Sequence, residues 1–217
     1  DPLWSRGLGD VYKRQTIISS YDFYGVTMIF FIAMMGATVP ANAFLEKHIK
    51  NGNTRIFYSP VSRVSIYSSK ILTCFLFMAL ALTINIIIFD TISLVNFGSD
   101  KIGYVILLII NFVLFLTILS SAICVTLHSE ELTNVILSNS MSVLGFLSGI
   151  FFPIASLGAI FEKIASFSPI KWTVDCIFQL IYDGQSTNYW WIMFALLTLS
   201  SLLLLVVHKN YRPEDYI

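Results

Sequence analysis

Long apolar runs separated by short polar segments dominate this chain. Five runs almost free of Asp, Glu, Lys and Arg predict membrane spans at about residues 23–45, 71–90, 102–127, 132–155 and 188–208. Each is close to or above the ~20 residues with which a helix crosses a ~30 Å hydrocarbon core. The runs are apolar on all faces instead of alternating, which favours helices over the strands of a barrel. The pattern predicts an all-α polytopic membrane protein with five transmembrane helices.

A segment rich in breakpoints, residues 156–185, follows the fourth run. Apolar residues at helical spacing on either side of Pro169 predict two short amphipathic helices there. We expect these helices to form an outer re-entrant hairpin that dips into the membrane surface. The rings of Trp172 and Tyr182 suit an interfacial position, and Trp190 and Trp191 mark the outer edge of the last span.

Lysine and arginine are distributed unequally among the polar segments. The loop 46–70 and the C-terminal tail together hold seven: Lys47, Lys50, Arg55, Arg63, Lys70, Lys209 and Arg212. The opposite side holds Lys101, Lys163 and Lys171. Because cytoplasmic loops are enriched in Lys and Arg, we expect the loop 46–70 and the C-terminus to be cytoplasmic.

The first fifteen residues share no pattern with the remainder of the chain and are left out of that count. They resemble translated adapter sequence, so we expect residues 1–15 to be non-native and residues 16–217 to form a single transmembrane domain.

Composition and motifs narrow the function classes. With 56% hydrophobic and 12% charged residues, the chain does not have the composition of a soluble domain. A net charge of zero and the lack of a basic stripe argue against nucleic-acid binding. The sequence contains no phosphate loop, HExxH pair or GxSxG turn, and no span has an ionisable residue in its interior. We therefore predict that the chain is not an enzyme and holds no cofactor or metal of its own, and the same absence disfavours an ion channel.

Isolated polar residues within the spans leave two interpretations open. Asn85, Asn111 and Asn139 could hydrogen-bond between helices or line a substrate path, and the first is favoured. His48, His128 and His208 could form a pH sensor or metal site, but ordinary polar residues at helix ends are favoured. We expect Cys74, Cys124 and Cys176 to be structural, because they are scattered without metal-binding spacing.

The loop 46–70 has ordered local signals. Asn51-Gly52 predicts a turn, and Ser59-Pro60 predicts the start of a short helix with proline at its first position. Such a helix, lying at the membrane surface with Arg55 and Arg63, could dock a soluble partner. The alternative is a basic loop held against anionic headgroups, and physical arguments alone do not choose between them.

Two sets of residues resemble ABC-2 type permeases, the membrane subunits of ATP-binding-cassette exporters. Glu46, Asn51-Gly52-x-x-Arg55, Ser59-Pro60-Val61-Ser62-Arg63 and Lys70 are similar to the loop after the family's second helix. Ser148-Gly149-Ile150-Phe151-Phe152-Pro153, Ser168-Pro169-x-x-Trp172 and Asp183-Gly184 are similar to its fifth helix and outer hairpin. The resemblance extends from about Tyr21 to the C-terminus and does not include the family's first helix. The sequence departs from the family pattern at Gly52-Asn53-Thr54 and at Ile56-Phe57.

The resemblance implies a permease that moves a substrate out across the cell membrane, in a bacterium. A separate ATPase subunit would hold ATP and Mg, and a second permease copy, identical or not, would complete the path. The implied ATPase-coupling residues are Glu46, Gly52, Arg55, Pro60, Arg63 and Lys70, and the implied outer gate comprises Gly149, Pro153, Pro169 and Trp172. The alternative is a non-transporting scaffold whose basic loop anchors lipid or protein. The sequence does not identify the transported substrate.

Overall fold

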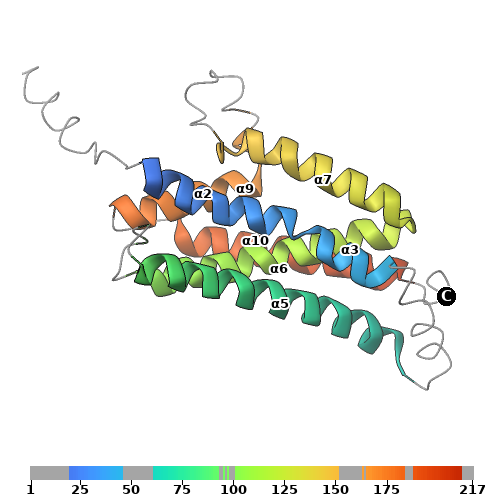
Figure 1. Cartoon of the computed structure of the whole chain (residues 1–217). Coiled ribbons are helices and arrows are strands. Elements are labelled where there is room, and N and C mark those ends of the chain that lie inside the picture. Colours follow the sequence, from blue (N-terminus) through green and yellow to red (C-terminus); the bar gives the residue numbers. More distant parts are fainter. Residues whose placement is uncertain are drawn as a thin grey trace, which may run out of the picture.

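The computed structural model describes residues 20–45, 61–92, 95, 97, 101–151, 163, 165–183 and 188–211. Within these ranges the chain is helical and contains no strand, which confirms the all-α prediction. Figure 1 shows the helices as one bundle. They are α2 (Ser20–Met35), α3 (Thr38–Leu45), α5 (Arg63–Thr91), α6 (Ile102–Leu127), α7 (Glu130–Leu147), α9 (Pro169–Phe178), the π-helical turn η3 (Gln179–Asp183) and α10 (Tyr189–Asn210).

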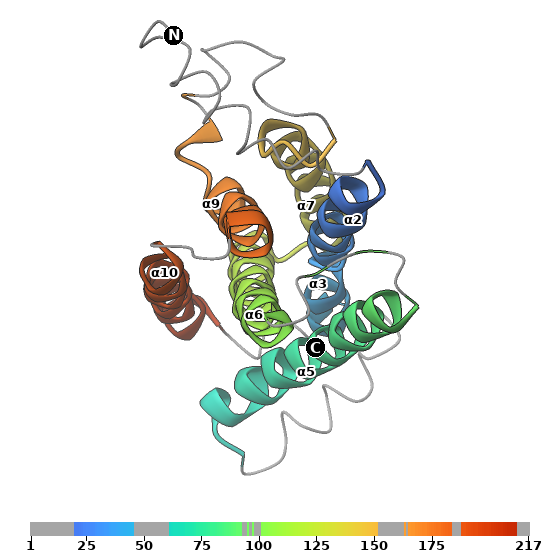
Figure 2. The ribbon, with the colours of Figure 1, turned by 90° about the vertical axis from the view of Figure 1, so that its left-hand side faces the viewer.

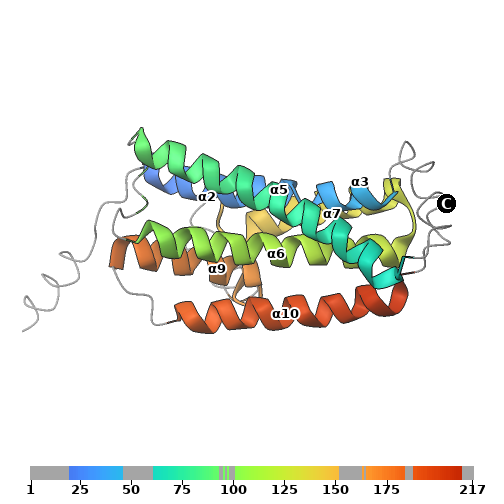
Figure 3. The same ribbon diagram turned by 90° about the horizontal axis from the view of Figure 1, so that it is seen from below.

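The long helices run back and forth along one axis (Figures 1 and 3). Helices α3, α6 and α10 end where α5 and α7 begin, and we call this the basic end. The opposite end, where α2, α6 and α10 begin, is the aromatic end. Among the described residues, four segments are long and apolar enough to cross a membrane: Tyr21–Leu45, Arg63–Thr91, Ile102–Leu127 and Tyr189–Asn210. Helix α7 runs beside them for 18 residues, about 27 Å at 1.5 Å per residue.

Helix α6 lies at the centre of the bundle, with α3, α5 and α10 packed around it (Figure 2). Most of its side chains are buried, including Thr117, Ser120 and Ser121. The hydroxyls of Thr117 and Ser121 donate to the carbonyl oxygens of Val113 and Thr117, each at 2.8 Å. Small residues that bond to their own helix allow neighbouring helices to approach closely within a membrane. The composition of α6 therefore fits its central position.

The first predicted span is formed by two helices, because α2 ends at Met35 and α3 begins at Thr38. Pro40 accounts for the break, since a proline inside a continuous helix would clash with the carbonyl of Gly36 and leave it without its donor. In the first turn of α3, Pro40 needs no donor. Gly36 occupies the turn where α5 comes close, since a Cβ on Gly36 would lie 1.9 Å from Met78 Cε.

Helix α5 differs from the predicted short surface helix that starts at Ser59-Pro60. It begins at Arg63, and Ser62 caps it, because the Ser62 hydroxyl accepts a hydrogen bond from the Ser65 amide at 3.3 Å. No glycine or proline interrupts the segment that follows, so the helix continues through Lys70 to Thr91. The predicted boundary between the loop 46–70 and the span 71–90 therefore falls inside one continuous helix.

Helix α7 ends earlier than the predicted span 132–155. Its last residue is Leu147, and Gly149 follows with φ 81°, in the left-handed region that glycine adopts without a steric penalty. The Phe151 ring packs beyond this turn against Phe31 and Phe146, with centroids 5.1 and 4.9 Å away.

Candidate functional site

The structure describes two of the predicted coupling residues, Arg63 and Lys70. Arg63 is exposed at the start of α5, whereas Lys70 is half-buried two turns further along the same helix. The ammonium group of Lys70 lies 5.2 Å from the centroid of the Phe44 ring, which belongs to α3. A cation at this distance from an aromatic face is attracted by the ring. Lys70 therefore joins α5 to α3, whereas Arg63 is exposed at the surface. Glu46, Gly52, Arg55 and Pro60 lie outside the described residues.

A cluster of side chains ties α5 to its neighbours at the basic end. The Tyr67 hydroxyl and His208 Nδ1 are 3.0 Å apart, which hydrogen-bonds α5 to α10. The ring of Tyr211 packs against the rings of Tyr67 and Phe44, with centroids 5.5 and 6.0 Å away. We call Phe44, Tyr67, Lys70, His208 and Tyr211 the anchoring cluster. It connects the ends of α3, α5 and α10, and the end of α6 joins the same buried group.

At the basic end, burial determines the protonation state of Tyr211. Burial raises the pKa of the Tyr211 phenol to about 12, and nearby Cys124 acts in the same direction. The phenol is therefore neutral at physiological pH, and the anchoring cluster gains no negative charge from it. Of the other histidines, His128 is the exposed left-handed residue that ends α6, with φ 54°, and His48 lies outside the described residues. Among the residues described, no group of three or more His, Cys, Asp and Glu could hold a metal ion.

The polar residues of the spans have different environments. The Asn111 amide nitrogen on α6 donates to the Met193 carbonyl oxygen on α10 at 3.0 Å, so this side chain hydrogen-bonds between helices as favoured above. Asn139 is exposed on the outer face of α7, and Asn85 is half-buried on α5. All three cysteines are buried thiols.

The described residues of the predicted outer gate lie in the half of the bundle nearest the aromatic end (Figures 1 and 3). Gly149 ends α7, Pro169 is the first residue of α9, and Trp172 lies one turn into α9; Pro153 is outside the described residues. Helix α9 packs alongside α6 and α10 over the half of the bundle nearest this end (Figures 1 and 3). Its buried face carries Ile170, Thr173, Val174, Cys176 and Ile177. Helix α9 is thus amphipathic, and its apolar face packs against protein; that it dips into the membrane surface stays a prediction. Most of the other predicted helix of this hairpin lies outside the described residues.

Specific contacts fix α9 in this position. The Trp172 indole nitrogen donates to the Ser166 carbonyl oxygen at 2.6 Å. The Phe178 ring stacks on the Phe23 ring of α2, with centroids 5.3 Å apart. The Tyr189 hydroxyl donates to the Tyr104 carbonyl oxygen at 3.1 Å, which holds the start of α10 against α6. If α9 forms part of a gate, the gate is a helix that is packed against α2 and α6.

Three aromatic residues of the anchoring cluster were not predicted from the sequence as functional residues. Phe44, Tyr67 and Tyr211 meet from three separate helix ends, and no local pattern joins them. The one available signal was their aromatic character near span ends, where such rings commonly anchor helices.

The fold and these contacts can be compared with known proteins. A family model described as ABC-2 family transporter protein matches residues 9–207. Comparisons with curated proteins and with solved structures give no match. The family match covers most of the chain, including every helix that the structure describes except the last three residues of α10. The chain therefore belongs to the ABC-2 transporter family, as a permease component that spans the membrane and is distinct from the ATPase.

Proposed function

We propose that this chain is the permease subunit of an ABC exporter, driven by ATP that a separate ATPase subunit hydrolyses. The ATPase docks at the basic end, on the loop that precedes α5, and the basic end faces the cytoplasm. The observation that carries the proposal within this family is the anchoring cluster, which joins the foot of α5 to α3, α6 and α10.

The orientation follows from where the helices begin and end. Leu45, Arg63 and Asn210 all lie at the basic end, so the segments attached to them are on the same side of the membrane. The loop 46–70 and the C-terminal tail together contain seven Lys and Arg residues, against three on the opposite side when residues 1–15 are left out. The bias of Lys and Arg towards the cytoplasm then places the basic end inside a bacterial cell.

The coupling mechanism is a rigid-body movement. Helix α5 is continuous from Arg63 to Thr91, so a force on its first turn acts along the whole helix. The contacts of Tyr67 with His208 and of Lys70 with Phe44 oppose any movement of α5 alone. Packed helices shift as units between discrete arrangements, and a tilt started at Arg63 therefore moves α3 and α10 as well.

A second permease copy completes the path. The exposed face of α7 contains Ser138, Asn139, Ser140 and Ser142 between exposed Val135 and Val143. Polar groups that face lipid are costly, although a serine can lower this cost as Ser142 does by donating to the Ser138 carbonyl oxygen at 2.8 Å. The Asn139 amide is too polar to be satisfied in hydrocarbon. The α7 face thus supports contact with another permease, of the same or a different sequence.

The test is co-expression with any ABC ATPase that is found encoded beside the gene for this chain. We expect the two to co-purify, and we expect the permease in lipid nanodiscs to change the rate of ATP hydrolysis. Arg63→Glu should weaken ATPase association about tenfold or more, the loss expected for 1.4 kcal/mol. Glutamate in the first turn of a helix is favourable, so this variant should still fold.

Lys101→Glu is the matched control, with the same charge reversal at the start of α6 at the aromatic end. It should leave ATPase association unchanged. Equal association of the Arg63→Glu and wild-type permeases would contradict docking at α5. A wild-type chain that binds no ATPase would instead favour the non-transporting scaffold.

A further inference from the structure

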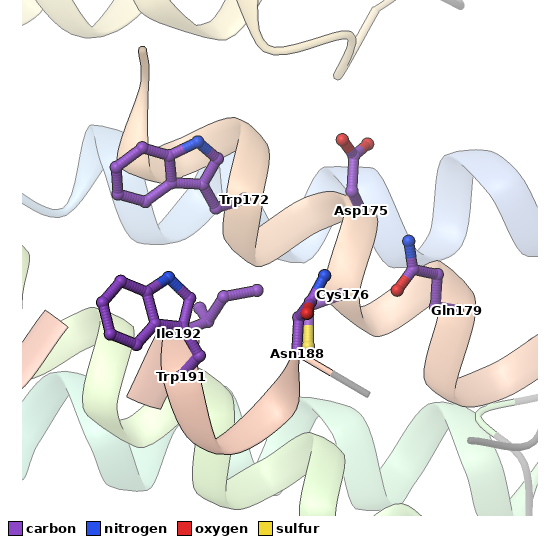
Figure 4. A pocket seen from close by; sticks show the side chains of 7 residues that line it. All are labelled: Trp172, Asp175, Cys176, Gln179, Asn188, Trp191 and Ile192. Atoms are coloured by element: carbon purple, nitrogen blue, oxygen red, sulfur yellow. The ribbon is translucent and has the colours of Figure 1, made fainter. Parts of the chain in front are cut away.

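A pocket at the aromatic end is separate from the anchoring cluster. It has a volume of ≈ 240 Å³ and lies between α9, η3 and the start of α10. Figure 4 shows the side chains around it. They include Trp172, Asp175, Cys176, Gln179, Asn188 and Trp191. Neither export nor ATPase coupling, as proposed above, uses this combination of groups.

Two indole rings form one side of the pocket. Trp172 and Trp191 lie one above the other in Figure 4, from α9 and α10 respectively. The hydrogen bond from Trp172 to the Ser166 carbonyl oxygen fixes the first indole. The second belongs to a side chain that is 69% exposed, so a molecule from outside can reach it. The electron-rich face of tryptophan attracts cations more strongly than that of the other aromatic side chains.

Asp175 of α9 contributes a carboxylate to the pocket lining. Asp175 points upward from α9 in Figure 4, and its side chain is 52% exposed. Lys171 Nζ is 4.0 Å from Asp175 Oδ2, at the outer limit for an ion pair. The Lys171 side chain is 14% exposed, whereas about half of the Asp175 side chain is exposed, so a second cation can approach the carboxylate from solvent. The charge of Asp175 therefore favours a positively charged ligand.

Two amides complete the polar lining. Gln179 is the first residue of η3, and π-helical turns frequently mark functional sites. Asn188 is at the N-cap position of α10, yet its side chain makes no capping hydrogen bond. In Figure 4 the Asn188 amide points up beside Cys176, between α9 and α10. The carbonyl oxygens of both amides can accept hydrogen bonds from N–H groups of a ligand.

We propose that this pocket binds the ammonium group of an organic cation. Paired indoles and one carboxylate match a quaternary or primary ammonium, and among the described residues no lysine or arginine lines the pocket to favour an anion. A small metal ion is a poor match because it prefers a shell of oxygen ligands. The ammonium can belong to a soluble cation or to a choline or ethanolamine lipid headgroup. The proposal concerns binding alone and does not depend on export.

The test titrates choline into the full chain in phosphatidylglycerol nanodiscs, whose headgroups have no ammonium. Its uncharged isostere 3,3-dimethyl-1-butanol is titrated in parallel, with calorimetry as the measurement. We expect saturable choline binding and an affinity for the isostere that is lower by about two- to fivefold, since a cation over exposed aromatic rings contributes roughly 0.5–1 kcal/mol. Trp191→Leu and Asp175→Asn should each reduce choline affinity by a similar factor.

Trp190→Leu is the matched control. Trp190 is adjacent and equally exposed at 69%, but its ring packs against Tyr189 and it is not part of the pocket lining. It should leave choline affinity unchanged. The proposal is overturned by a wild-type chain without saturable choline binding, by equal binding of the isostere, or by equal losses in the two leucine variants.

The source of the ammonium group is read from the same titration in phosphatidylcholine nanodiscs. Weaker apparent binding of free choline there supports occupation by a lipid headgroup. Unchanged binding supports a soluble cation.

Discussion

Gly25 and Gly36 allow other segments to approach the first span. A Cβ on Gly25 would lie 2.2 Å from Val95 Cγ2 and 3.1 Å from Val95 Cβ, and a Cβ on Gly36 would lie 1.9 Å from Met78 Cε. The two neighbours respond differently. The methyl group of Met78 is at the end of a flexible chain and can move, whereas Val95 is short, β-branched and buried. The space beside Gly25 is therefore the more restrictive of the two.

Gly25→Ala should lower the free energy of unfolding by about 1–3 kcal/mol, the usual cost of overpacking. Gly36→Ala should cost less, because Met78 can change rotamer. Gly103→Ala is the control: no atom lies within 4 Å of its added Cβ, and alanine forms helix better by about 1 kcal/mol. The measurement is thermal or denaturant-induced unfolding in detergent. Equal stability of the Gly25 and Gly103 variants would show that Val95 does not pack on α2 in solution.

At the scale of elements, the apolar runs identified the helical segments because a backbone in lipid must satisfy its own hydrogen bonds. They did not determine the helix boundaries. Pro40 lies inside an apolar run and divides it into α2 and α3. The sequence contains the cause, because a proline at this position cannot donate a hydrogen bond to the Gly36 carbonyl. At the start of α5 the sequence offers two serines, Ser59 and Ser62, and the structure assigns the cap to Ser62. From the sequence alone, either serine could serve as the N-cap of the helix.

Contacts between helices could not be predicted from the sequence. Tyr67 and His208 are 141 residues apart, and no periodicity in either helix indicates that they meet. The same holds for Trp172 and Trp191, whose pocket exists only because α9 packs beside α10. The family resemblance gave an order of motifs, but it did not provide these pairings.

The cap of α5 gives an element-scale prediction. Ser62→Ala removes the acceptor for the Ser65 amide and should lower the free energy of unfolding by about 0.5–2 kcal/mol. Ser62→Asp should restore it, because a carboxylate accepts the same bond and interacts favourably with the helix N-terminus. Hydrogen exchange of the first-turn amides should accelerate in the alanine variant alone. Similar losses in both variants would mean that Ser62 contributes something other than capping.

At the scale of the whole molecule, two exposed faces differ in character. The outer face of α5 is apolar along its length, with Leu76, Phe77, Leu80 and Ile84 exposed. The outer face of α7 combines exposed valines with exposed Ser140 and Asn139. Figure 2 shows α5 and α7 on opposite sides of the bundle. Lipid suits the first face, whereas the second is better covered by protein, because amides and hydroxyls find partners there.

This difference predicts how two permease copies meet. After replacement of the three native cysteines by alanine, single cysteines at Val135, Asn139 and Val143 place thiols one turn apart along the exposed face of α7. In a symmetric pair the same patch faces itself, so a residue near the two-fold axis comes within the Cα distance of about 4.4–6.8 Å that a disulfide requires. At least one of these variants should form a disulfide-linked dimer in oxidised membranes. Phe77→Cys, at a site 63% exposed on α5, is the matched control and should stay monomeric. The readout is non-reducing electrophoresis of membranes that contain the full chain. Dimers from the α5 control together with none from α7 would move the interface to the opposite side, and the polar α7 face would then need a partner other than a second copy of this chain.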